Sequence, residues 1–264
     1  MGRLVIVEAV SDEIAKIIKR FRIGDIKAET PEENAKRQSE YARKQSLKYY
    51  QQEDKKFLKK RSLFNQENSL VNEYKNMDEN SPQEFRDLAK RSVGVVRDFA
   101  NKNFYTVILT GKAGTGKTML TSCMLNKLNQ ETYLRCLFVS VPVMYDLVMS
   151  KFSKDTDKNI RKKQERLRYL MNDIKEADVI ALDDLGSETS LKTEVVEANQ
   201  TFQDTLFKIG EIIQTKGLVI STNNSSGDFK SMYNPKIISR LLTKNPDHVF
   251  NFPETLEDKR IAKR

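Results

Sequence analysis

The chain has 264 residues, of which 31% are charged and 38% hydrophobic, and its formal net charge is +9 at pH 7. This length is enough for one large domain, or for one domain with a smaller appendage. The basic balance suits a polyanionic partner such as nucleic acid, although a basic protein without such a partner has the same composition.

The composition also disfavours a zinc-binding protein and a membrane protein. One histidine and two cysteines argue against a zinc site. The apolar runs are too short for a membrane-spanning helix, so we expect no membrane association. The expected compartment is the cytoplasm.

The first part of the chain predicts a helical appendage and not an enzyme domain. Apolar side chains recur at helical spacing within residues 11–24, which predicts a short helix that packs on its neighbour or docks on a partner. Thr30-Pro31-Glu32-Glu33 is a capping box that begins a long, highly charged helix to about Arg61. Its apolar residues are too sparse for a core helix. We therefore expect a solvated arm over residues 1–65 and a core over residues 66–264.

Strands and helices then alternate. A second capping box, Ser81-Pro82-Gln83-Glu84, begins a helix that precedes the first strand. Apolar runs predict strands at residues 104–110, 133–140, 178–182, 218–221 and 249–252. Helical patterns occupy residues 118–128, 142–152, 169–176, 195–213 and 235–242. Residues 153–168 form a basic, polar stretch. The alternation predicts an α/β fold with an open, mostly parallel sheet.

The residues after the first strand predict a phosphate-binding loop. Gly111-Lys112-Ala113-Gly114-Thr115-Gly116-Lys117-Thr118 fits the pattern G-x-x-x-x-G-K-[ST]. Its glycines allow positive φ, so that backbone N–H groups can converge on phosphate oxygens. We expect Lys117 to reach the β- and γ-phosphates and the Thr118 hydroxyl to bind Mg²⁺. Met119, the next residue, is also assigned to the nucleotide site.

Two later strands end in polar residues that suit the same site. Val179-Ile180-Ala181-Leu182-Asp183-Asp184 is an apolar strand followed by two carboxylates, which is the Walker B pattern. We expect Asp183 to hold Mg²⁺ through water and Asp184 to polarise the attacking water. Asn223, after the strand Val219–Thr222, is placed to orient that water. For both strands the alternative is an ordinary polar turn.

In combination these motifs resemble AAA+ ATPases. The segments that carry the resemblance are Gly111–Thr118, Leu182-Asp183-Asp184-Leu185-Gly186, Ser221-Thr222-Asn223 and Ile237-Ile238-Ser239-Arg240-Leu241. More narrowly, residues 70–260 look similar to replicative-helicase loaders of the DnaC/DnaI type, including phage-encoded ones, and to the related transposition ATPases of the IstB type. The resemblance implies a P-loop core with a central parallel sheet flanked by helices, no C-terminal lid, and Mg²⁺-dependent ATP hydrolysis.

The resemblance also implies roles for residues beyond the loop. Arg240 matches the arginine finger, which in such families acts in trans on the neighbouring subunit's nucleotide and so implies a ring or spiral of subunits. A surface helix arginine is the alternative. Arg260 is the candidate for sensor 2, with Lys259 as the other choice of register. Asp184 stands where many AAA+ proteins have glutamate, and its shorter side chain suggests slow turnover.

The segment between the second and third strands is the expected DNA-binding surface. In this family the helical insertion there, which corresponds to residues 145–163, faces single-stranded DNA. Aromatic side chains can stack on bases while cations follow the phosphate backbone. The assigned residues are Lys151, Phe152, Lys154, Arg161, Lys162 and Lys163. The alternative is a solvated charged loop with Phe152 in the core.

Three functions remain open from the sequence. The first is an ATP-dependent loader whose arm at residues 1–65 grips the hexameric replicative helicase and whose core delivers it onto single-stranded DNA. The second is an IstB-type ATPase that binds duplex DNA and activates a transposase. The third is a module that binds ATP and assembles but barely hydrolyses it.

Overall fold

The computed structural model describes residues 31–65, 70, 72–77, 81–154, 156–188 and 197–256. Contacts divide the chain into two compact units, residues 1–50 and residues 51–264, and each is described by itself. Some expectations from the sequence fall outside the described residues. They are the helix at residues 11–24, the Thr30 end of the first capping box, and the sensor 2 candidate Arg260 with its alternative Lys259.

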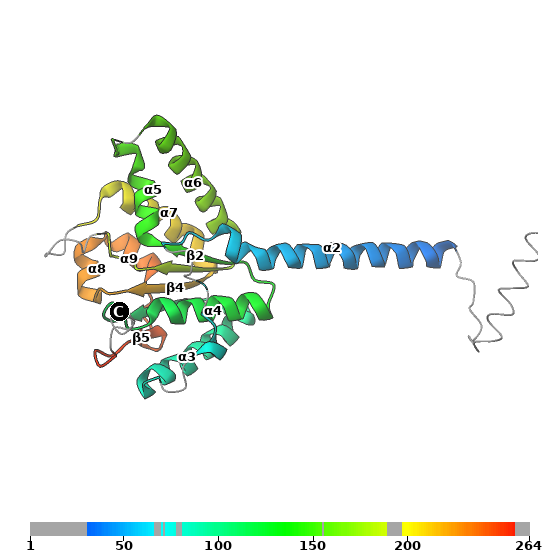
Figure 1. Cartoon of the computed structure of the whole chain (residues 1–264), viewed down its shortest axis with the longest axis horizontal. Helices are drawn as coiled ribbons and strands as arrows, with labels where there is room; N and C mark the ends of the chain where they lie inside the picture. The colour runs from blue at the N-terminus through cyan, green and yellow to red at the C-terminus, as the bar shows by residue number, and fades with distance from the viewer. Residues whose placement is uncertain are drawn as a thin grey trace, which may run out of the picture. The chain divides into compact units, whose positions relative to one another are not determined.

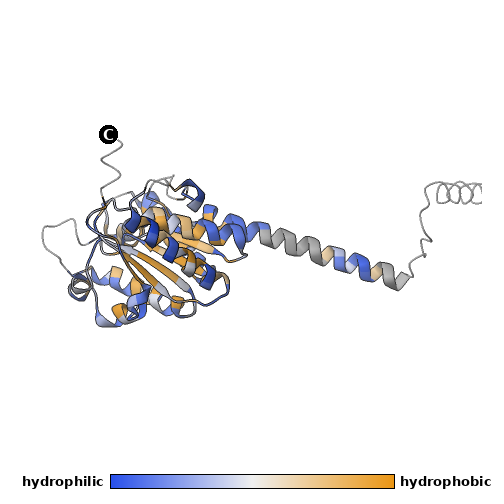
Figure 2. Cartoon of the chain, turned by 90° about the horizontal axis from the view of Figure 1, so that it is seen from below, coloured by the Kyte–Doolittle hydropathy of each residue, from blue (hydrophilic) through white to orange (hydrophobic). Residues whose placement is uncertain are grey.

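The larger unit contains a five-stranded parallel sheet with the strand order β2-β3-β4-β1-β5 (Figure 1). Its strands are β1 (Thr106–Thr110), β2 (Cys136–Ser140), β3 (Val179–Asp183), β4 (Gly217–Thr222) and β5 (Val249–Asn251). Every residue of β2, β3 and β4 is buried, as expected for parallel strands covered on both faces. The strands are correspondingly hydrophobic in Figure 2. The predicted α/β fold with a parallel sheet is confirmed.

Helices cover both faces of this sheet (Figure 1). Their bounds are α3 (Gln83–Ala100), α4 (Lys117–Glu131), α5 (Val141–Met149), α6 (Asp157–Glu176), α7 (Gln200–Ile212), α8 (Ser226–Met232) and α9 (Pro235–Leu241). Short 3₁₀ turns are η1 (Tyr74–Asn76), η2 (Ser150–Phe152), η3 (Ile213–Thr215) and η4 (Pro246–His248). Alternate strand residues point to opposite faces. Accordingly Leu137 and Val139 pack with α5 to α9, whereas Cys136 and Phe138 pack with α3 and α4.

The long charged helix is α2 (Pro31–Arg61), and its last turns belong to the larger unit. Phe57 and Leu58 are buried, one in each of the two core clusters. The chain then runs beside β2, where the Leu63 N–H donates to the Phe138 carbonyl at 2.8 Å. Residues 51–65, which we expect from the sequence to be part of the arm, therefore pack with the core. The described side chains of residues 35–42 are exposed.

Three local expectations differ from the structure. The basic stretch at residues 153–168 is mostly helical, because α6 begins at Asp157 with Thr156 as its N-cap. The second capping box is not formed: Pro82 is the N-cap of α3, and the buried Ser81 hydroxyl has no hydrogen-bond partner in the described part of the chain. A capping box occurs instead at Ser225, which begins the unexpected helix α8. No described helix is both long and apolar enough to cross a bilayer.

The burial of Phe57 can be tested by truncation. We expect Phe57→Ala to lower the free energy of unfolding by about 3–5 kcal/mol, because it leaves a cavity between α2 and the core. Tyr41→Ala is the matched control: Tyr41 lies on the same helix but is 64% exposed, against 7% for Phe57. It should change stability by less than about 0.5 kcal/mol. Urea unfolding of both full-length variants measures this, and equal effects would contradict the assignment of Phe57 to the core.

Candidate active site

The loop between β1 and α4 is tightly curled. Gly111, Gly114 and Gly116 all have positive φ, at 151°, 80° and 100°. Two of them also lack room for a side chain. A Cβ on Gly111 would lie 2.7 Å from the Phe252 backbone oxygen, and one on Gly116 would lie 2.9 Å from the Phe85 ring. Glycine is therefore required at these positions for both conformational and steric reasons.

Lys117 is the first residue of α4, and its ammonium group lies inside the curl of the loop. Its Nζ donates to the carbonyl oxygens of Gly111 at 2.8 Å and Lys112 at 2.6 Å, and the residue is only 4% exposed. The same region is the amino-terminal end of α4, where the helix dipole is positive. A buried cation beside the N–H groups at the start of a helix suits an anionic ligand, and phosphate is the anion that such loops bind.

Asp183 closes the site from the end of β3. The Thr118 hydroxyl donates to its two carboxylate oxygens at 3.0 and 3.1 Å, and the Ser221 hydroxyl donates to Oδ1 at 2.5 Å. Asp183 is 6% exposed, and this burial raises its pKa to about 6. The charge of Asp184 also raises the pKa, whereas the two hydroxyls and Lys117 lower it. A threonine hydroxyl beside a buried carboxylate is an oxygen donor set that fits Mg²⁺.

Asp184 follows in a strained turn. Its φ is +60°, a value uncommon for a residue with a side chain, and its N–H donates to the Ser221 hydroxyl at 2.9 Å. Ser221 thus contacts both acidic residues, although the sequence singled it out only as part of the Ser-Thr-Asn segment. Its residue type gave no signal of this role, because the contact depends on β3 and β4 being neighbours.

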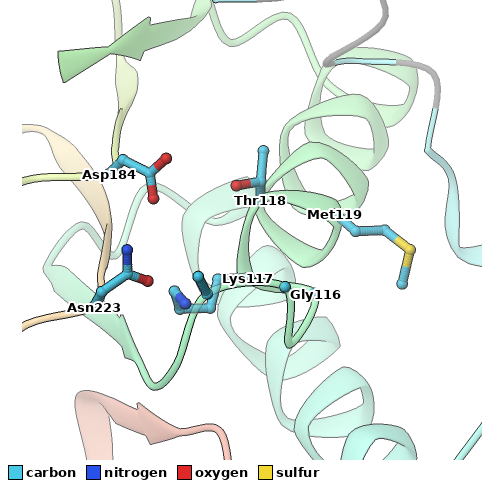
Figure 3. A pocket seen from close by; sticks show the side chains of 8 residues that line it. Gly116, Lys117, Thr118, Met119, Asp184 and Asn223 are labelled. Atoms are coloured by element: carbon cyan, nitrogen blue, oxygen red, sulfur yellow. The ribbon is translucent and has the colours of Figure 1, made fainter. Parts of the chain in front are cut away.

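One cavity brings the loop and the two strand ends together (Figure 3). The residues that line it are Ala113, Gly114, Gly116, Lys117, Thr118, Met119, Asp184 and Asn223. The Asp184 carboxylate points toward Thr118, and Asn223 lies next to Lys117 (Figure 3). The Met119 side chain points to the other side of Thr118 (Figure 3). A nucleotide phosphate in this cavity would meet a cation, loop N–H groups, a carboxylate and an amide.

Other residues predicted for the nucleotide site are not among those that line this cavity. Lys112 is exposed and forms an ion pair with Glu254 at 2.9 Å. Thr115 is buried, and its hydroxyl donates to the Lys112 carbonyl at 2.9 Å, which holds the loop curled. Arg240 lies on α9, with its guanidinium 4.4 Å from the centre of the Phe207 ring, and is also outside the cavity lining.

The residues predicted to bind DNA lie on η2, in the segment after it and on the first half of α6. Phe152 is 62% exposed, so the alternative that it belongs to the core is wrong. The Lys151 ammonium lies 5.0 Å from the centre of the Phe152 ring. Lys163 is partly buried and forms an ion pair with Asp146 at 3.1 Å. The remaining members of the set are exposed: Lys154, Arg161 and Lys162.

The raised pKa of Asp183 makes a prediction about stability. Above pH 6 the buried Asp183 carboxylate is ionised, and this ionisation lowers the free energy of unfolding. The loss is relieved as the pH falls from about 6 toward the ordinary pKa of an aspartate, because the folded protein then binds the proton first. We expect Asp183→Asn to stabilise the nucleotide-free protein at pH 8 by up to about 3 kcal/mol, and the gain to vanish near pH 4. Calorimetry in chelator, without nucleotide, measures this. A gain that is independent of pH, or a loss at pH 8, would contradict it.

Comparisons with known proteins agree with this geometry. The family model described as ATPase family associated with various cellular activities (AAA) matches residues 107–245, more than half of the chain. The replicative helicase loader DnaC of Escherichia coli strain K12 is 33% identical over 98 residues, which are 37% of this chain and 36% of DnaC. The match thus spans about a third of the length of this relative.

Two solved structures share the fold. A crystal structure of DnaI has a TM-score of 0.52 and 17% identity, and the match covers 77% of this chain and 98% of DnaI. A candidate primosome component from Streptococcus pyogenes serotype M3 has a TM-score of 0.52 and 15% identity, with 75% and 96% covered. The resemblance to DnaC and DnaI seen in the motifs is confirmed. The chain belongs to the AAA family of ATPases, whose members in general bind a nucleotide together with a divalent metal.

Proposed function

We propose that this protein is an ATP-dependent loader that binds the hexameric replicative DNA helicase and delivers it onto single-stranded DNA. The observation that carries the proposal is the 33% identity with DnaC, a replicative helicase loader, in a chain that forms a nucleotide cavity. The relatives reported above are replication proteins, so they support the loader and not the transposition ATPase. Such a loader acts in the cytoplasm of the cell or of the host.

The ligands of the cavity are ATP and Mg²⁺. Lys117 binds the phosphates, and Thr118 and Asp183 hold the ion, which neutralises phosphate charge when bound. Asp184 and Asn223 lie at the opposite wall, where they orient and polarise the attacking water (Figure 3). The carboxylate of an aspartate reaches less far than that of a glutamate, so hydrolysis is slow. We therefore expect an ATPase with a low turnover rate.

Arg240 completes the site of a neighbouring subunit in a ring or spiral. Two observations support this arrangement. The residue lies outside the lining of its own chain's cavity, and its guanidinium is held on the surface of α7 by the Phe207 ring. A guanidinium held in one orientation loses less freedom when it contacts a phosphate of another subunit.

Single-stranded DNA binds along η2 and α6. Phe152 presents its ring to solvent beside the Lys151 ammonium, which combines a stacking surface with a cation that can contact a phosphate. Three exposed cations extend this surface: Lys154 before α6, and Arg161 and Lys162 within it. None of these contacts reads base identity, so the surface accepts any sequence.

The arm, expected from the sequence at residues 1–65, grips the helicase through its residues before position 51, because residues 51–65 pack with the core. Its described residues 35–42 are exposed along one helix, and Tyr41 is a large aromatic side chain among them. Exposed aromatic residues on a charged helix are typical anchors of protein interfaces. The helicase is thereby bound through the arm, while the core handles ATP and DNA.

Complex formation with the replicative helicase of the same genome or host tests the loader directly. We expect the full-length protein to co-elute with the hexamer in size-exclusion chromatography with light scattering. Tyr41→Ala should weaken the complex at least tenfold if Tyr41 is an anchor worth about 2 kcal/mol. Tyr133→Ala is the matched control, because Tyr133 is similarly exposed but lies in the core unit. Absence of any complex with the wild-type protein would refute the loader.

The DNA surface makes a separate prediction. We expect Phe152→Ala to lower the affinity for a single-stranded oligonucleotide about 5- to 150-fold, because one base-stacking contact is worth about 1–3 kcal/mol. The dependence of affinity on salt should not change, since no charge is removed. Lys151→Ala should instead reduce that dependence. Fluorescence anisotropy across a salt series separates the two, and an unchanged affinity for Phe152→Ala would remove Phe152 from the surface.

A further inference from the structure

A second, partly buried carboxylate follows the Walker B segment and is not among the residues that line the nucleotide cavity. Glu188 accepts a hydrogen bond from the Gly186 N–H at 3.1 Å and another from the Tyr233 hydroxyl. Tyr233 is 4% exposed and lies between α8 and α9. The pair joins two segments that are 45 residues apart in the sequence.

Burial makes this pair more than an incidental contact. Burial raises the pKa of both the Glu188 carboxyl and the Tyr233 hydroxyl, and the hydrogen bond between them offsets part of the cost of removing these groups from water. Neither residue is among those that line the nucleotide cavity. Because the pair lies outside the nucleotide cavity, it can affect the site only through the two segments that it joins.

At one end the pair holds the Walker B segment. The Leu185 N–H donates to the Ser221 carbonyl at 2.9 Å, and the Thr222 hydroxyl donates to the Leu185 carbonyl at 2.7 Å. Gly186 has a φ of +92°, and a Cβ there would lie 2.2 Å from the Asn224 amide. These contacts fasten residues 184–188 to the end of β4, so Glu188 is fixed relative to Asp183 and Asn223.

At the other end the pair holds α9. Tyr233 directly precedes Asn234, whose side chain caps α9 and whose N–H donates to the buried Gln203 side chain at 2.8 Å. Further along α9, Arg240 packs on α7: a Cβ on Gly210 would lie only 3.0 Å from the Arg240 Cβ. The helix that carries Arg240 is thus set at its start by Tyr233 and along its length by α7.

We propose that the Glu188–Tyr233 hydrogen bond is a positioning link that sets the arginine-finger helix α9 against the Walker B segment of the same subunit. This inference rests on the proposed function, in which Arg240 completes the site of the neighbouring subunit. The link then affects hydrolysis in the neighbour and not in its own cavity. Glu188 and Tyr233 are positioning residues, because they act through Arg240 and touch no substrate.

Mixed assemblies separate the two sites. Full-length Lys117→Ala subunits lose nucleotide binding but keep Arg240, whereas Arg240→Ala subunits keep the cavity but lack the finger. Each should be inactive alone, and an equal mixture should recover part of the wild-type ATPase rate with Mg²⁺ and single-stranded DNA. This parent mixture tests the trans finger. If no activity returns, the trans finger is refuted, and the link is refuted with it.

Tyr233→Phe is then added to one member of the mixture at a time, because it removes the hydroxyl and keeps the ring. In the finger-donating Lys117→Ala subunit it should lower the recovered rate roughly tenfold, the effect of losing one hydrogen bond to a charged group. In the nucleotide-binding Arg240→Ala subunit it should change the rate less than about twofold. Equal losses in both positions, or a loss only in the nucleotide-binding subunit, would overturn the link.

Two further variants guard against a purely structural effect. Glu188→Gln keeps an oxygen that accepts from Tyr233, so in the finger donor it should retain more activity than Tyr233→Phe. The double variant Glu188→Ala with Tyr233→Phe removes the partly buried carboxylate together with the hydroxyl that pairs with it, so it should melt closer to the wild type than Tyr233→Phe alone. It should still lower the recovered rate in the finger donor. A double variant that restores the rate along with the stability would show that the pair serves folding only, and would refute the link.

Discussion

Parallel pairing of β4 with both β1 and β3 is the constraint on which the site depends. Carboxyl ends of parallel strands meet at one edge of a sheet, and here that edge collects the P-loop after β1, the two aspartates at the end of β3 and Asn223 after β4. Thr118 and Asp183 are 65 residues apart and yet hydrogen-bonded. A slip in strand register would separate them, so the buried apolar strands fix the chemistry as well as the core.

The electrostatic cost of the site is concentrated in few residues. Asp183 is buried with a raised pKa, and Asp184 is held at positive φ, so both acidic residues are placed at the expense of folding stability. The Ser221 hydroxyl contacts both and offsets part of that cost. At Glu188 the Tyr233 hydroxyl and the Gly186 N–H likewise donate to a partly buried carboxylate, and these hydrogen bonds offset part of the cost of removing it from water.

Much of the fold follows from local patterns in the sequence. The apolar runs predicted every strand of the sheet, and the glycine spacing predicted a loop whose backbone has positive φ. The membership of residues 51–65 in the core could not be predicted in this way. Phe57 and Leu58 are isolated apolar residues in a charged helix, and each is buried because tertiary packing places the helix end where the two core clusters meet.

The site was also predictable only in part. Lysine, threonine and aspartate in motif spacing indicated the cavity, because those residue types have few other reasons to occur together. Ser221 and the Glu188–Tyr233 pair gave no such signal, since serine, glutamate and tyrosine occur everywhere and these contacts join separate elements. The exposure of Phe152 was likewise undecided from sequence, where an aromatic residue after an apolar helix suits either the core or the surface.

The short strand-like segment after α2 has a consequence for assembly. β2 is the outermost strand on its side of the sheet, and such edges invite pairing with other chains. Here the Phe138 N–H donates to the Ser62 hydroxyl at 2.9 Å, the Phe138 carbonyl accepts from Leu63, and the Ser140 N–H donates to the Leu63 carbonyl at 2.8 Å. The middle of this edge is thereby sealed against sheet extension and the aggregation that follows from it. Contacts between copies of this chain at the β2 side of the sheet would therefore form through side-chain surfaces and not through shared backbone hydrogen bonds.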